Sequence, residues 1–232
     1  MVPLAADPAQ LLDRLVHATQ AMGAAASVFT AAIPEGERDH SCFALFACHP
    51  AIAQLHRNGG LLLNHPWVRF ACTHSMPGTN HQIDLRNEAD AAAVRLASQH
   101  GFRSCLVIPM SVGAQTGRSE MLCIGSDTVD DFEGPEVRVV RSLAHALAAE
   151  LHDWLTRHLM QRLRSMGQLH GVDIRLLVLQ QQGLGTKAIA LRTGMSLSAV
   201  NSRFQRINVQ LGCSNRKRSA KRAAAYGLLE SP

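Results

Sequence analysis

The sequence predicts an α+β fold in two domains, and three observations carry that prediction. A length of 232 residues suits two domains better than one. Charge is unevenly divided: residues 1–155 hold 10 basic and 16 acidic residues, whereas residues 156–232 hold 13 basic and 2 acidic ones. Helical and strand-like patterns alternate in the first part, but only short helical patterns occur in the last. We therefore expect a first domain over 1–155, a linker over 156–167 and a second domain over 168–232.

The first domain alternates helices with strands. Strand patterns cover 27–33, 41–48, 103–112 and 120–126, and helical patterns cover 8–23, 49–60, 88–100 and 134–155. The last two strands flank a glycine-rich turn from Gly113 to Gly117, which predicts a hairpin. An antiparallel sheet with helices on its faces would bury the apolar sides of these elements.

Four short helices are predicted in the second domain, between Leu169 and Leu229. The second and third are joined by a tight turn that contains glycine, and this arrangement predicts a helix-turn-helix if the third helix has a polar outer face. The expected caps and stops are Gly183, Thr186, Gly194 and Ser196 or Ser198.

The third of these helices is amphipathic. Val200, Phe204, Ile207 and Leu211 are spaced by 4, 3 and 4, which gives one buried stripe. Arginine suits the guanine edge in the major groove of DNA, and asparagine or glutamine suits the adenine edge. An ordinary amphipathic surface helix would show the same spacing. The opposite side presents Ser198, Ala199, Ser202, Gln205 and Arg206, and Asn201 and Arg203 flank it.

The order of these residues over 169–229 resembles the C-terminal DNA-binding domain of LuxR-type transcription regulators, without a gap. Asp173, Ala199 and Arg203 stand where the family has Glu, Thr and His. The basic cluster from Arg216 to Arg222 is expected to touch phosphates. The resemblance implies DNA contacts by Lys187, Ser198, Ala199, Asn201, Ser202, Arg203, Gln205, Arg206, Arg216 and Lys217.

The first domain resembles the autoinducer-binding domain of the same family, an α-β-α sandwich that encloses an acyl-homoserine lactone. His65-Pro66 stands where the family has Asp-Pro. The family's aromatic and acidic ligand contacts align with Ile52, His56, His65, Asn80 and Cys105, and all five differ. We therefore do not expect lactone binding in the usual pose. The side chains expected to fill the space are Phe70, Met76, Met110 and Met121.

Other classes of function find little support in the sequence. No metal site is expected, because the histidines and cysteines match no zinc spacing. No cofactor is expected, and the chain lacks nucleophile and phosphate-loop motifs, so we expect no enzyme. The start of the chain lacks a signal peptide and no stretch could span a membrane, which predicts a cytoplasmic protein with reduced, buried cysteines.

The expected function is a DNA-binding transcription regulator of the LuxR type, acting as a homodimer on a two-fold-symmetric duplex site. The long helix that ends near Trp154 is the expected contact between copies. Three versions stay open at this point: a regulator that senses another small molecule, a regulator that needs no ligand, and an interaction protein that pairs with an intact relative and inhibits it. Four basic residues argue against the third, since an inhibitor needs no groove-reading face: Lys187, Arg203, Arg206 and Arg216.

Overall fold

A computed structural model describes residues 7–34, 40–59, 64–111, 117–135, 137–166 and 169–229 of the chain. The chain divides into two compact units, which are described separately below. The first unit holds most of residues 1–154, and the second unit begins at Leu155 and has two short additional segments. The helix, strand and sheet content is that of the predicted α+β class.

A five-stranded sheet forms the centre of the first unit, with the strand order β2-β1-β5-β4-β3. The strands are β1 (Ala26–Pro34), β2 (His40–Ala47), β3 (Gly78–Thr79), β4 (Ser104–Ser111) and β5 (Ser119–Ser126). The β4–β5 hairpin is in the expected place, and its register pairs Val107 with Cys123. β1 runs antiparallel to β5, and β3 runs antiparallel to β4.

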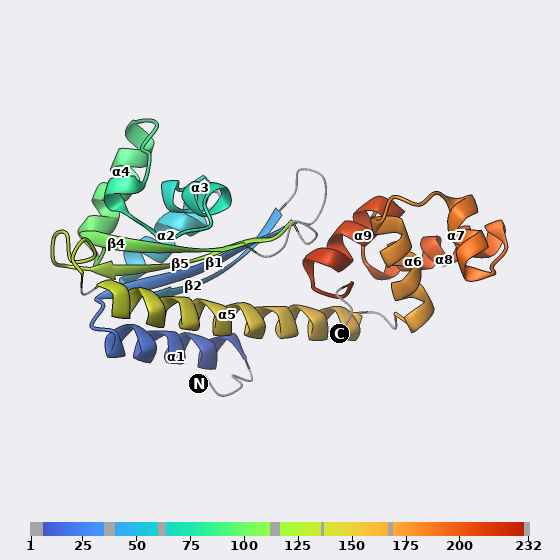
Figure 1. The fold of residues 1–232 in the computed structure, drawn as a ribbon, viewed down its shortest axis with the longest axis horizontal. Coiled ribbons are helices and arrows are strands. Elements are labelled where there is room, and N and C mark those ends of the chain that lie inside the picture. The colour runs from blue at the N-terminus through green and yellow to red at the C-terminus, as the bar shows by residue number, and fades with distance from the viewer. Residues whose placement is uncertain are drawn as a thin grey trace. The chain divides into compact units, whose positions relative to one another are not determined.

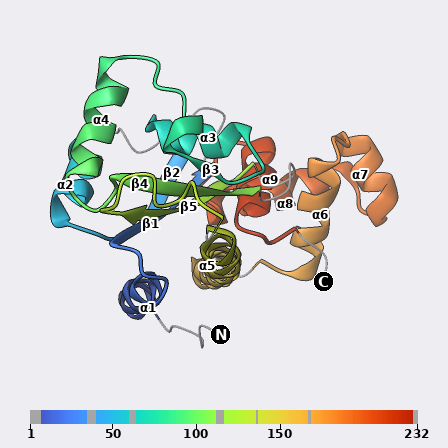
Figure 2. The ribbon, with the colours of Figure 1, turned by 60° about the vertical axis from the view of Figure 1, so that its left-hand side comes forward.

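Helices cover both faces of the sheet, so the first unit is the α-β-α sandwich that was expected (Figure 1). The two views show α1 and α5 on one face and α2, α3 and α4 on the other (Figures 1 and 2). The helices of this unit are α1 (Pro8–Ala21), α2 (Pro50–Gly59), α3 (Pro66–Thr73), α4 (Glu88–Ser98) and the part of α5 (Val137–Met166) up to Trp154, with a 3-10 turn at Asn80–Gln82.

Local sequence signals explain where these helices begin. Asp7 caps α1 by accepting a hydrogen bond from the Gln10 amide, with Pro8 as the first helical residue. Asn87 caps α4 in the same way, through the Asp90 amide. At the end of α4, Gly101 has a φ of +94°, and a Cβ at this position would lie 2.8 Å from the Cβ of Ala26, so glycine is required there.

Two helices differ from the prediction. The sequence pattern missed α3, a helix of 8 residues whose apolar side chains are nearly all buried and so lack a helical period. α5 was expected to end near Leu155 but continues to Met166, through the segment expected as a linker. No glycine or proline interrupts it, and Leu151, Leu155, Leu159 and Leu163 repeat every four residues and are all buried.

Four helices make up the C-terminal part of the second unit. They are α6 (Gly171–Gln181), α7 (Thr186–Thr193), α8 (Leu197–Gln210) and α9 (Arg216–Ala225). α6 packs against α9 and α8, and α7 packs against α8. Their shared core consists of Leu176, Leu177, Ile189, Val200, Phe204, Ile207, Leu211, Ala220 and Ala223.

The expected helix stops and caps of this group are present, with one correction. Gly183 and Gly194 have φ values of +83° and +69°, the left-handed conformation that ends a helix. Ser196 caps α8 by accepting a hydrogen bond from the Ala199 amide. Thr186 is not the cap of α7, because Gly185 occupies that position and Thr186 is the first helical residue.

Candidate nucleic-acid interface and ligand-pocket positions

The α8 helix presents the polar face that its sequence predicts. Val200, Phe204 and Ile207 are buried on one side. The predicted DNA-contact residues Ala199 and Arg203 are half-buried at the edges of the other side. The fully exposed residues on that side are Ser198, Asn201, Ser202, Gln205 and Arg206. The structure thus leaves the donors and acceptors of this side of the helix accessible.

Arg203 has a partner inside the four-helix group. Its Nε atom lies 3.6 Å from Oδ1 of Asp173, and the Arg203 side chain is 23% exposed. Asp173 is buried at the start of α6, where its Oδ2 accepts a hydrogen bond of 2.9 Å from the His170 amide. One carboxylate therefore caps α6 and pairs with α8. The cap could be predicted from the position of Asp173 in the first helical turn, but the pairing with Arg203 joins residues 30 positions apart.

Arg216 also has internal contacts. Its Nη1 donates a hydrogen bond of 2.6 Å to the hydroxyl of Thr186, and its guanidinium lies 5.8 Å from the centre of the Phe204 ring. Arg216 thus connects α9 to α7 and α8, in addition to any contact with phosphate. Lys187 and Lys217, by contrast, are fully exposed at the first turns of α7 and α9.

The aligned pocket positions of the first unit take part in internal packing. Ile52 and Cys105 are buried in one apolar cluster on the sheet. His65 caps α3, and its ring packs against Trp67 with the centroids 4.5 Å apart. Asn80 is half-buried, and its side chain accepts a hydrogen bond from the Cys105 amide and donates one to the Arg103 carbonyl. The side chain of His56 lies outside the described residues.

Aromatic rings occupy the space around these positions. Trp67 and Phe102 are buried with their ring centroids 5.0 Å apart. Phe70 is buried so close to Gly78 that a Cβ on this glycine would lie 2.3 Å from the ring. Glycine at position 78 therefore lets the ring lie against the backbone.

The expected filling residues are only partly correct. Phe70 and Met121 are buried in the apolar cluster, as expected. Met110 is half-buried. Met76 was expected to fill the core, but it is 70% exposed in the segment between α3 and β3. It follows the C-terminal end of α3, which the sequence pattern did not predict, so its direction could not be judged.

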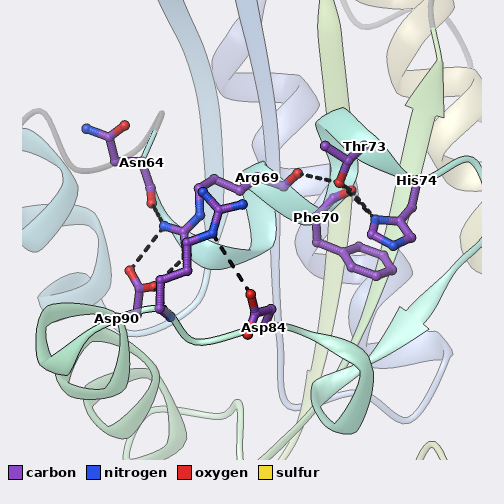
Figure 3. A network of polar contacts seen from close by, with 8 residues as sticks. Asn64, Arg69, Phe70, Thr73, His74, Asp84 and Asp90 are labelled. Carbon is purple, nitrogen blue, oxygen red and sulfur yellow. Dashed lines mark hydrogen bonds and ion pairs between the residues drawn. The ribbon is translucent and has the colours of Figure 1, made fainter.

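A polar cluster outside both predicted sites connects α3 to α4 (Figure 3). The guanidinium of Arg69 binds both carboxylate oxygens of Asp90, at 3.1 and 2.5 Å, and also donates to the Asn64 carbonyl. Asp90 accepts a further hydrogen bond of 2.8 Å from the Arg86 amide. Sequence reasoning missed this cluster, because its arginine lies in the helix that was not predicted.

The Asp90 cluster predicts an acid-sensitive contribution to the stability of the first unit. The hydrogen bond from Arg69, and then that from the Arg86 amide, lower the pKa of Asp90 below its usual value. Its stabilisation is therefore complete above a pH of about 4 and is lost as the pH falls through the lowered pKa. Asp90→Asn should lower the melting temperature at pH 7, and this difference should shrink as the pH falls toward 3. An equal difference at both pH values would show that ionised Asp90 has no such role.

Among the described residues, no group of three histidine, cysteine or acidic side chains could hold a metal ion. All six cysteines are free, as expected, but only Cys105 and Cys123 are buried, whereas Cys42 and Cys72 are exposed. Burial raises the pKa of the half-buried Cys48 to about 12, which keeps this thiol protonated at neutral pH. In the parts of the chain that the structure describes, every helix is too short or too polar to cross a membrane.

Comparisons with known proteins find similarity in structure and none in sequence. No protein-family model matches the chain, and no curated protein matches it. A crystal structure of SdiA from Escherichia coli has a TM-score of 0.71 at 13% identity, covering 99% of this chain and 95% of SdiA. SdiA in complex with octanoyl-rac-glycerol has a TM-score of 0.65 at 11% identity, covering 100% of this chain and 93% of that one.

A third solved structure carries a description of its function. CepR2 from Burkholderia cenocepacia is described as an N-acylhomoserine-lactone-dependent transcription factor of the LuxR family. It has a TM-score of 0.56 at 16% identity, covering 68% of this chain and 90% of CepR2. At these identities the similarity shows that this chain shares the fold of such proteins.

Proposed function

We propose that the protein is a DNA-binding transcription regulator of the LuxR type, in which α6–α9 form the helix-turn-helix domain. One observation carries the proposal: α8 buries its apolar stripe completely and leaves Asn201, Gln205 and Arg206 exposed on the other side of the helix. These are the residue types that read adenine and guanine edges. The similarity in fold to a LuxR-family transcription factor supports the same reading. We keep the domain boundary near residue 168, although α5 continues up to Met166.

The exposed lysines at the first turns of α7 and α9 are proposed to contact phosphates. Lys187→Ala should weaken binding to all sequences about equally and should reduce the slope of log K against log salt by about one unit. The measurement is binding to a specific and a random duplex at several salt concentrations. Arg95→Ala in the first unit removes the same charge far from α7 along the chain and should leave the slope unchanged. A loss restricted to one duplex sequence would assign Lys187 to base recognition instead.

We propose further that the regulator does not depend on acyl-homoserine lactones. Among the pocket positions whose side chains the structure describes, Ile52, Cys105 and His65 pack with buried apolar or aromatic side chains and Asn80 binds backbone groups, so they support the fold themselves. The chain should therefore fold without ligand, and lactones should not raise its melting temperature. A lactone at 100 times its dissociation constant would stabilise the protein by about 2.7 kcal/mol, which a thermal scan detects easily. A clear shift with any of these lactones at micromolar concentration would refute lactone independence.

Action as a homodimer on a two-fold-symmetric site is part of the same proposal, because one recognition helix reads only a few base pairs. The first half of α5 supports a contact between copies. Val139 and Leu143 lie one turn apart on this helix and are 67% and 49% exposed. Trp154 is not available for such a contact, because it is buried against Phe43.

A further inference from the structure

Two open cavities lie beside α3 in the first unit. The aligned pocket position His65 lines one of them, whereas Ile52 and Cys105 line neither. One has a volume of about 350 Å³ and the other of about 240 Å³. Both are lined by Pro66, Arg69 and Arg86. Because they share these three walls, we treat them as two lobes of one groove. Volumes of this size are at the lower end of the range for small-molecule sites, which favours a small ligand over a long acyl chain.

The charged wall of this groove is held rigidly. Arg69 is fixed by both oxygens of Asp90, and the two side chains are only 21% and 8% exposed. The same carboxylate accepts the Arg86 amide, so it also fixes the start of the segment that leads into α4. Figure 3 shows Asn64 and Asp90 beside the guanidinium of Arg69. Asp90 is thus used inside the protein, and its charge is compensated by Arg69.

Two charged side chains of the groove remain weakly engaged. Arg86 and Asp84 are 61% and 85% exposed, and their Nε and Oδ2 atoms stand 4.0 Å apart. This separation is too long for a hydrogen bond, and an exposed pair of this kind contributes little stability. The side chains of Arg86 and Asp84 therefore lie next to each other in the groove, and a ligand can replace their contact at little cost in stability.

We propose that this groove binds a free α-amino acid, whose carboxylate pairs with Arg86 and whose ammonium pairs with Asp84. A guanidinium can bind a carboxylate through two parallel hydrogen bonds, and a carboxylate accepts from an ammonium. The ligand side chain then lies along the lobe lined by Thr73, His74 and Gln82. Gln82 uses its carbonyl oxygen to accept from the Thr79 amide, which leaves its NH₂ group to donate.

A ligand of this class satisfies both charges at once. A simple carboxylate bound to Arg86 would bring its negative charge next to the negative charge of Asp84. A simple amine bound to Asp84 would bring its positive charge next to the positive charge of Arg86. The zwitterion is the only one of the three that places each charge next to its opposite. Binding at this groove goes beyond the proposed regulation of transcription and does not depend on it.

The test uses the full chain without DNA. Its melting temperature is measured with each of the twenty amino acids at about 10 mM, and those that raise it are measured by calorimetry. A ligand present at about 100 times its dissociation constant should raise the transition of the first unit by roughly 5 °C or more. Each active amino acid is compared with two analogues that keep its side chain, one with hydrogen in place of the amino group and one with hydrogen in place of the carboxyl group.

Variants then locate the site. Arg86→Ala and Asp84→Asn should each weaken binding at least tenfold, and both should fold because their side chains are mostly exposed. Arg95→Ala is the control, since Arg95 pairs with Glu88 and lines neither lobe. The proposal is overturned if no amino acid shifts the melting temperature, if either analogue binds as well as the zwitterion, or if binding survives in Arg86→Ala. Failure of this test leaves the DNA-binding proposal intact, because DNA takes no part in it.

Discussion

Replacing both Gln205 and Arg206 by alanine should remove most of the protein's preference for its specific duplex. Both side chains are exposed on the polar side of α8, opposite the buried stripe. Each lost base contact should cost about 1–3 kcal/mol, so the double variant should lose about 2–6 kcal/mol of specific binding. Binding to random duplex should fall much less, because only one positive charge is removed.

The measurement is a competition titration in which the specific duplex and a random duplex are bound by the wild type and by each variant at one salt concentration. Arg95→Ala again removes one positive charge and should leave the preference unchanged. If the double variant lost affinity equally for both duplexes, Arg206 would be a phosphate contact, and the face that reads bases would have to be another one.

Replacing Phe204 by alanine should destabilise the second unit by about 3–5 kcal/mol, the usual cost of removing a buried aromatic side chain. Phe204 is only 3% exposed, and the guanidinium of Arg216 lies over its ring. Its loss leaves a cavity beneath α8 and also removes this contact to α9. The free energy of opening is read from hydrogen exchange of the backbone amides in α6–α9.

Val209 offers a matched control on the same helix. It is also apolar, but it is 82% exposed, so Val209→Ala should change the stability by no more than about 0.5 kcal/mol. If Phe204→Ala were as mild as this control, α8 would not be anchored through its apolar stripe. The buried stripe would then not explain why Gln205 and Arg206 face outward.

The features that follow from local sequence could be predicted well. The buried stripe of α8 rests on a period of 3.6 residues, which is a property of the helix itself. Its cap at Ser196 and the helix stops at Gly183 and Gly194 are equally local, because side-chain reach and left-handed backbone conformation decide them. The hairpin of β4 and β5 also follows from adjacent strands and a glycine-rich turn.

The features that depend on tertiary contacts could not be predicted. Nothing local distinguishes Arg203, which pairs with Asp173, from the exposed Arg206 three positions further along α8. The bond from Arg216 to Thr186 likewise joins residues 30 positions apart. Both arginines are expected to contact DNA, and the structure gives each of them an internal contact as well.

In the candidate pocket, too, some features follow from the sequence and others depend on tertiary contacts. The expectation that Ile52, His65 and Cys105 replace aromatic or acidic ligand contacts comes from the resemblance to the family, position by position. Which side chains pack around these positions could not be predicted, because this depends on which face α3 buries. Trp67 and Phe70 are buried on this helix, and Met76, beyond its end, is exposed.

Selection of binding sites from a pool of random duplexes with the full chain tests the central claim most directly. Sequence reading by α8 in a dimer predicts enrichment of two-fold-symmetric sites, with half-sites about one helical turn apart. Enriched half-sites should carry guanine or adenine at positions that Arg206 and Gln205 can reach. Enrichment of asymmetric single half-sites alone would contradict the dimer. A pool that emerges without any enriched sequence would contradict the proposal that this protein reads DNA.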